Sequence, residues 1–300
     1  MIGKIRTDLA LEAKELWRES ADETTKLSGV EAYDETRGSF KINTVKILDE
    51  EGERQLGKPR GTYVTIELDG LIRREENAFE DSANILADEL KKILKLEESA
   101  SVLVAGLGND AITPDAIGPE TVNCVMVTRH LKQHMPLEFA AFRRVSAIQS
   151  GVLGTTGIES ADMISAVCER LSPDCVIAVD ALASRRMDRL CRTIQIADTG
   201  IVPGSGVGNS RMALNTETLG IPVIAVGVPT VVDAATLAID MAQRAGVSLE
   251  SANFGDDGTM IVTPRDIDRC VKDISKLIGY GLNLALHKGL TIPDIDMFLS

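Results

Sequence analysis

The stretch SVLVAGLGNDAITPDAIGPETV, residues 101–122, decides the fold. Its apolar run 102–105 predicts a buried strand, and the two glycines that follow predict a tight turn. Thr113 and Pro114 predict a helix start, with Thr113 as the N-cap and Pro114 at the first helical position. Asp115 is therefore expected just inside a helix, close beyond the end of a strand. In α/β proteins this is where chemistry is usually placed.

Strand and helix patterns alternate through the rest of the chain. The ranges with strand patterns are 39–48, 61–68, 102–105, 175–179 and 222–228. The ranges with helix patterns are 9–17, 77–95, 115–132, 161–170, 231–245 and a long C-terminal segment that begins at Thr263-Pro264. Short apolar strands separated by helices predict an α/β fold, with a mixed, largely parallel sheet flanked by helices. We expect one domain over residues 1–300, in which residues 1–60 form a less regular N-terminal extension.

The composition argues against several classes of partner. The formal net charge of −13 disfavours binding to nucleic acid or to anionic membrane surfaces. The longest apolar stretch, 221–239, is interrupted by Pro222, Pro229 and Asp233, so we expect no membrane span. The five cysteines form no C-x-x-C motif, which is typical of reduced cysteines in a cytoplasmic protein.

A second acid stands in the same context as the first. Asp180 directly follows the apolar run 175–179 and precedes small residues, as Asp115 follows its own strand. If the two strands are neighbours, both carboxylates meet at one crevice, where one pKa rises and the pair can share a proton. Such a pair can activate a water and protonate a leaving group. The residues alone leave a second interpretation open, in which both acids only stabilise helix N-termini.

Other motifs give weaker indications of chemistry. Gly106, Gly108 and Ala111 match the dinucleotide pattern G-x-G-x-x-A, but the expected helix begins beyond them and no acid follows at the required distance. His130 and His134 have metal-ligand spacing, but no Glu lies between them as in H-E-x-x-H, so a surface pair is favoured. We expect no cofactor and no metal.

Long blocks of the chain resemble the germination protease, or spore protease, family of endospore-forming bacteria. The blocks that carry this resemblance are RTDLALEA (6–13), GTYVTIEL (61–68), VAGLGNDAITPDAIGP (104–119), GVLGTTGIES (151–160), CVIAVDALASR (175–185), RTIQIADTGIVPGSGVGN (192–209), GIPVIAVGVPTVVDA (220–234) and GLNLALH (281–287). They extend over nearly the whole chain.

The resemblance implies an atypical aspartic endopeptidase that degrades small acid-soluble spore proteins during germination, in the cytoplasm of the spore core. It implies a homotetramer and an α/β fold of the phosphorylase/hydrolase-like kind, similar to hydrogenase maturation peptidases. The family's catalytic aspartates fall at Asp115 and Asp180. In the maturation peptidases the matching acids bind nickel, but no histidine is placed here to complete such a site.

One feature departs from the family pattern. Family members are typically made as zymogens with a propeptide before the RTDLA block, whereas five residues, Met1 to Ile5, precede Arg6 here. We expect either a much shorter propeptide or a start close to the mature one. The alternatives to a protease with an aspartate dyad are a metal-dependent maturation-type peptidase that uses the same acids, a nucleotide-binding protein that is not a protease, and a non-catalytic structural protein.

Overall fold

The structure, a computed structural model, describes residues 5–21, 27–247 and 260–300. Residues 1–4, which make up most of the segment before Arg6, therefore lie outside the described residues.

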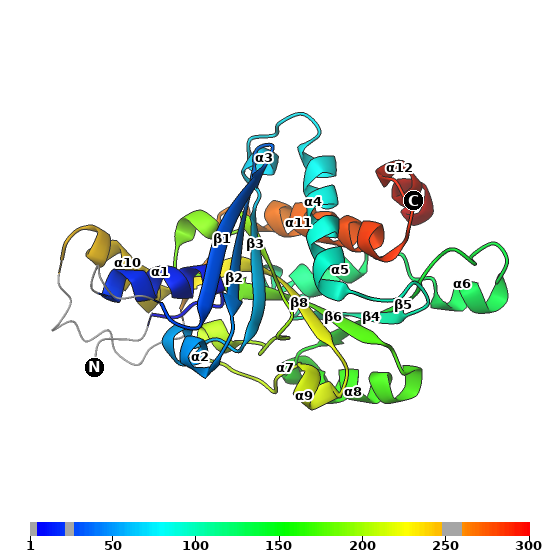
Figure 1. Cartoon of the computed structure of the whole chain (residues 1–300), viewed down its shortest axis with the longest axis horizontal. Coiled ribbons are helices and arrows are strands. Elements are labelled where there is room, and N and C mark those ends of the chain that lie inside the picture. The colour runs from blue at the N-terminus through cyan, green and yellow to red at the C-terminus, as the bar shows by residue number, and fades with distance from the viewer. Residues whose placement is uncertain (1–4, 22–26, 248–259) are drawn as a thin grey trace.

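A mixed sheet of nine strands forms the centre of the molecule (Figure 1). The strands are, in their order across the sheet, β1 (Val30–Arg37), β2 (Phe40–Ile47), β3 (Gly61–Glu67), β7 (Thr193–Ala197), β8 (Val223–Asp233), β6 (Cys175–Ala183), β4 (Ser101–Leu107) and β5 (Arg144–Gly151), and β9 (Ile261–Val262) pairs with β8. Strands β8, β6, β4 and β5 are parallel to one another. The pairings among β1, β2, β3, β7 and β8, and that of β9 with β8, are antiparallel.

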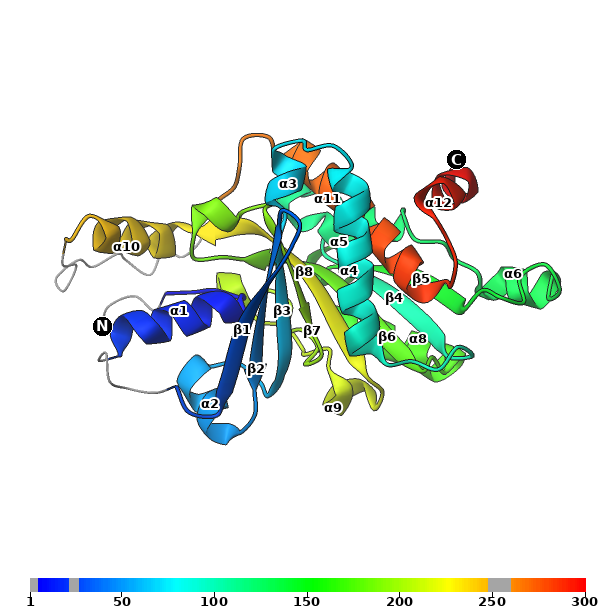
Figure 2. The ribbon, with the colours of Figure 1, turned by 45° about the horizontal axis from the view of Figure 1, so that its top comes forward.

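Helices cover both faces of the sheet, which confirms the expected α/β class. The helices are α1 (Ala10–Ser20), α2 (Glu50–Leu56), α3 (Asp69–Ile72), α4 (Ala78–Leu94), α5 (Ile117–Val122), α6 (Arg129–His134), α7 (Leu153–Thr156), α8 (Ser160–Leu171), α9 (Thr216–Leu219), α10 (Ala234–Arg244), α11 (Ile267–Leu286) and α12 (Ile292–Leu299), with short 3₁₀ turns η1 (Thr113–Asp115), η2 (Met187–Arg189) and η3 (Ser205–Val207). Figures 1 and 2 show α4, α5 and α11 on one side of the parallel strands and α8 on the other.

Strand β4 shows why both faces must be covered. Val102 and Val104 point into the apolar cluster that includes α4, α5 and α11. Leu103 and Ala105, which alternate with them, point into the cluster that includes α8. Successive side chains of a strand face opposite sides, so an uninterrupted apolar run requires a core on each side.

The helix expected over 115–132 is wrong, because the chain there forms η1, α5 and α6 with a break between the last two. The break coincides with hydrogen bonds to the side chain of Asn283 in α11. Its Oδ1 accepts from the Met126 N–H at 2.8 Å, and its Nδ2 donates to the Cys124 carbonyl at 2.9 Å. The amide of a distant helix thus satisfies backbone groups that a continuous helix would have paired internally.

The N-terminal part is more regular than the expected extension over residues 1–60. It contains α1, β1, β2 and α2, and both strands belong to the central sheet. The sequence of β1, VEAYDETR, does not predict a strand, because β1 is an exposed edge strand without an apolar pattern. Strand β7 likewise lies outside the ranges in which the sequence predicts a strand. No helix of the described residues is long and apolar enough to cross a membrane.

Candidate active site

Asp115 and Asp180 line the same cavity, which has a volume of about 640 Å³. It lies at the carboxyl ends of β4 and β6, which are parallel neighbours, as the dyad hypothesis required. Their pairing ends at Gly106 opposite Val179, and Asp180 is the next residue along β6. The sheet order therefore brings together two acids that belong to distant segments of the chain.

Hydrogen bonds to two other segments hold Asp115 and the η1 turn in which it lies. Its Oδ2 accepts a hydrogen bond from the backbone N–H of Asn109 at 2.9 Å. The hydroxyl of Thr230 in β8 donates to the Pro114 carbonyl at 2.7 Å and ties the η1 turn to the sheet. Thr113 is the first residue of η1 and makes no side-chain cap, so the expected N-cap role is wrong. Pro114 is the second residue of η1, so it lies in the first turn but not at the expected first helical position.

The glycines of the opening stretch allow close backbone contacts. A Cβ on Gly108, whose φ is +108°, would overlap the carbonyl oxygen of Asp115. A Cβ on Gly118 in α5 would lie 2.5 Å from the carbonyl oxygen of Val179 and would overlap the backbone of Leu107. These glycines allow Asp115 and α5 to pack directly against β4 and β6. Close packing therefore explains the glycines, and a phosphate-binding loop is not needed to explain them.

Both carboxyl groups hold their protons more tightly than an ordinary aspartic acid. Burial raises the pKa of Asp115 from 3.8 to about 6, against the opposing effect of the Asn109 N–H. Asp180 is only 4% exposed, and burial raises its pKa well above the usual range, with further contributions from the negative charges of Asp115 and Asp8. The Ala181 N–H, which donates to Asp180 Oδ1 at 2.9 Å, opposes the rise. At neutral pH the pair therefore favours one ionised and one protonated carboxyl.

Asp8 is the cavity residue that sequence reasoning missed. Its Oδ2 accepts from the Ala183 N–H at 2.8 Å, its Oδ1 accepts from the Ser205 hydroxyl at 2.7 Å, and its own N–H donates to the Ala183 carbonyl at 2.9 Å. The N-terminal segment thus docks along the end of β6, beside Asp180. Asp8 stands in the block RTDLALEA, which resembles the family. The spacing of residues in that block does not predict that Asp8 lies beside Asp180.

Three further acids of the resembling blocks contact other residues. Asp233 caps α10 by accepting from the Thr236 N–H at 2.8 Å, and Asp198 accepts from the Thr62 N–H at 2.7 Å. Glu159 lines the cavity and lies 4.0 Å from Arg211. In the described part of the chain, no three His, Cys, Asp or Glu side chains are grouped so that they could hold a metal ion.

The histidines lie away from the acid pair. His130 and His134 are exposed on α6. His287 is 2% exposed beside Phe142, with ring centroids 5.4 Å apart, and burial lowers its pKa to about 4. The buried His287 ring is therefore neutral at physiological pH.

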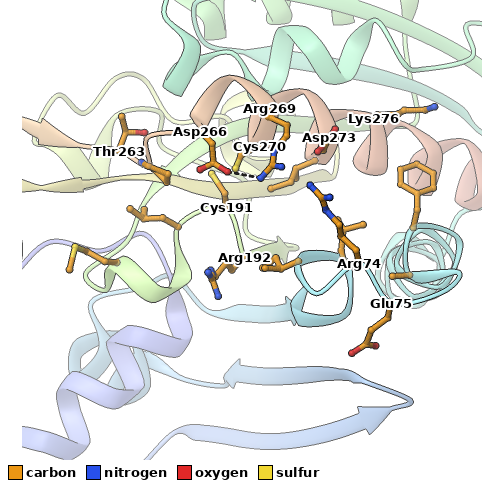
Figure 3. A pocket seen from close by; sticks show the side chains of 18 of the residues that line it. Arg74, Glu75, Cys191, Arg192, Thr263, Asp266, Arg269, Cys270, Asp273 and Lys276 are labelled. Atoms are coloured by element: carbon orange, nitrogen blue, oxygen red, sulfur yellow. Dashed lines mark hydrogen bonds and ion pairs between the residues drawn. The ribbon is translucent and has the colours of Figure 1, made fainter.

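A larger cavity of about 750 Å³ contains neither Asp115 nor Asp180 (Figure 3). It lies among α3, α4, η2 and the start of α11, and Cys191 and Cys270 are part of its wall. An ion pair of 2.6 Å joins Arg269 to Asp266 at its rim. We place the candidate active site in the smaller cavity, because two carboxyls with raised pKa converge there at the ends of parallel strands.

Comparisons with known proteins agree with the resemblance seen in the sequence. The family model described as germination protease matches residues 10–244. The germination protease of Caldanaerobacter subterraneus subsp. tengcongensis is 45% identical, with 98% of each chain covered. That of Clostridium tetani is 43% identical, with 99% of each covered, and that of Bacillus pumilus is 38% identical, with 98% of this chain and 96% of the relative covered.

A solved structure, the [NiFe] hydrogenase maturation protease HycI from Thermococcus kodakarensis KOD1, matches 65% of this chain and 98% of its own, with 17% identity and a TM-score of 0.36. The family assignment does not depend on that structure. Since the family model covers most of the chain and the relatives match it from end to end, this protein belongs to the germination protease family.

Proposed function

We propose that this protein is an endopeptidase that begins the degradation of small acid-soluble spore proteins during germination, by means of a water activated by Asp115 and Asp180. The observation that supports the proposal is the shared cavity, in which burial raises the pKa of both carboxyls. A single buried acid could be a packing residue. Two that meet at one water-accessible crevice form an acid and a base.

The two acids differ in environment, and this difference assigns their roles. Asp115, with a pKa of about 6, is ionised at neutral pH and acts as the base. Asp180 is more deeply buried and keeps its proton, which it offers to the oxygen of the scissile carbonyl. The water attacks the carbonyl carbon, its proton passes to Asp115, and the carbonyl oxygen takes the proton of Asp180. The tetrahedral diol then collapses as the C–N bond breaks, Asp115 protonates the departing nitrogen and Asp180 recovers a proton from the diol.

The proposal includes the assembly and the setting of the enzyme. We expect a homotetramer in the spore core, made as a zymogen, with a net charge of −13 that keeps it from competing with its substrates for DNA. Sedimentation measures the first expectation. Binding of the purified protein to DNA at low salt would contradict the last.

The test is cleavage of a purified small acid-soluble spore protein, followed by mass spectrometry of the products. The wild-type chain is expected to cut it at internal bonds, and Asp115→Asn and Asp180→Asn are each expected to fold without cleaving. Asp188→Asn is the matched control, because Asp188 is an exposed acid of η2, outside the cavity, whose side chain is 52% exposed. Near-normal cleavage by either cavity variant would refute the dyad.

The same assay separates the proposed dyad from the metal-dependent alternative. Cleavage is expected to be unchanged after extended treatment with EDTA. Loss of cleavage in EDTA, with recovery on addition of nickel or zinc, would favour a metal-dependent peptidase that uses the same acids.

A further inference from the structure

Strands β4 and β6 separate at the point where the cavity opens. Their parallel pairing ends at Gly106 opposite Val179, whereas β6 continues to Ala183 and is paired over this last part with β8. The residues beyond the end of the pairing, from Asp180 to Ala183, line the cavity. One edge of β6 therefore faces the cavity instead of a neighbouring strand.

The hydrogen bonds of β6 to the β8 segment show which of its backbone groups face the cavity. The N–H of Val176 donates to the Pro222 carbonyl at 3.0 Å, and that of Ser184 donates to the Val231 carbonyl at 3.0 Å. In a parallel ladder, successive residues direct their N–H and C=O groups alternately towards the two sides of the strand. The even-numbered residues of β6 therefore face β8, and the odd-numbered residues face the opposite side, where β4 ends and the cavity begins.

Ala181 has an unused carbonyl on this edge. If β4 continued, the N–H of Asn109 would donate to the Ala181 carbonyl. The N–H of Asn109 donates instead to the carbonyl and to Oδ2 of Asp115, at 3.1 and 2.9 Å. No other group of the described residues donates to the Ala181 carbonyl. The hydrogen bonds that hold Asp115 thus leave a backbone acceptor unpaired at the wall of the cavity, where Ala181 is half-buried.

The next outward-facing residue, Ala183, shows that this edge can pair with a further chain segment. Its carbonyl accepts the N–H of Asp8 at 2.9 Å, and its N–H donates to Asp8 Oδ2 at 2.8 Å. The N-terminal segment therefore occupies the far end of the edge. The unpaired position at Ala181 lies between Asp8 and the acid pair, because Asp180 directly precedes Ala181.

We propose that this edge of β6 binds the substrate as an added strand, with the Ala181 carbonyl as the acceptor for one of its backbone N–H groups. The inference rests on the proposed function, because it presupposes that a peptide occupies this cavity. Such a bond recognises the backbone of the substrate and not its side chains. Since each residue of a strand advances by about 3.3 Å, the bound N–H is expected within two residues of the cleaved bond.

The test is a backbone scan of a peptide that the wild-type enzyme cleaves, taken from a small acid-soluble spore protein. Each amide within four residues of the cut, except the cleaved one, is replaced in turn by an ester, which removes the N–H and keeps the side chain. We expect one ester to lower kcat/KM by about 5–50-fold, because it leaves the Ala181 carbonyl unpaired in a poorly solvated site. The esters at the two adjacent positions are the controls and should change kcat/KM by less than about twofold, since their N–H groups point away from β6.

Binding is measured separately, because an ester close to the cut can also change the reactivity of the cleaved bond. Asp115→Asn is expected to bind the peptide without cleaving it, and fluorescence anisotropy of a labelled peptide gives its Kd. The sensitive ester should raise this Kd by a factor similar to the loss in kcat/KM. A crystal structure of Asp115→Asn with the uncleaved peptide should show the peptide N–H within hydrogen-bond distance of the Ala181 oxygen.

The outcomes distinguish the two proposals. If every ester is cleaved as well as the parent peptide, or if the sensitive ester leaves Kd unchanged, β6 does not bind the substrate as an added strand and the proposed function stands. A bound peptide that makes no hydrogen bond to Ala181 would lead to the same conclusion. If the wild-type enzyme cleaves no peptide or protein of this class, the proposed function fails and the added strand fails with it.

Discussion

Replacing Asp115 with asparagine should abolish cleavage and at the same time stabilise the folded protein. The amide oxygen can still accept the Asn109 N–H that Asp115 Oδ2 accepts at 2.9 Å, so the main change is loss of a carboxylate from a poorly solvated site. Because the pKa of Asp115 rises from 3.8 to about 6 on folding, the folded state disfavours the ionised form. The variant does not carry this cost.

The magnitude follows from the change in proton affinity. At about 1.4 kcal/mol for each tenfold change, the full rise corresponds to about 3 kcal/mol, and solvent in the cavity reduces this to about 1–2 kcal/mol. The sign depends on pH. The native protein loses this stability as the pH rises from about 4 to about 6, and above that the cost is constant. The variant should therefore be more stable than the wild type at pH 8 and nearly equal to it at pH 4.

The assay is equilibrium unfolding in urea at both pH values, followed by the fluorescence of Trp17, the single tryptophan of the chain. Asp198→Asn is the control, since Asp198 also accepts a backbone N–H, at 2.7 Å from Thr62, but is exposed and lies outside the cavity. It should show no gain at pH 8. A gain for Asp115→Asn that is equal at pH 4 and pH 8, or a loss at pH 8, would refute the reasoning.

Three further changes test other parts of the structure. Gly118→Ala should lower the unfolding free energy by more than about 2 kcal/mol, because its Cβ would overlap fixed backbone, whereas Gly154→Ala meets no atom within 4 Å and should be tolerated in the same urea titration. His287→Leu should reduce the loss of stability on acidification from pH 6.5 towards 4, where the buried neutral ring must otherwise take up a proton; an unchanged pH dependence of the thermal midpoint would contradict this. Asp8→Asn should shift the alkaline limb of the kcat/KM profile to lower pH, because a negative charge that helps Asp180 keep its proton is removed; a superimposable profile would count against that role.

The local sequence was sufficient for the elements that carry a strong apolar pattern. The runs 102–105, 175–179 and 222–228 are buried on both faces, so hydrophobicity alone marks β4, β6 and β8. The sequence also predicted that Asp115 follows a strand and a glycine turn. It placed Asp180 directly after the apolar run 175–179. The long blocks in which these acids stand were sufficient to indicate the germination protease family.

Only the tertiary structure decided how these parts meet. The neighbouring positions of β4 and β6 turn two separate acids into a pair in one cavity, and burial there sets their proton affinities. The break after α5 is accompanied by hydrogen bonds to the side chain of Asn283, far along the chain, which no local helix pattern contains. Asp8 and Arg211 likewise enter the site through contacts between distant segments. Local propensity acts within a few residues, whereas desolvation, charge and hydrogen bonding act between whatever the fold brings together.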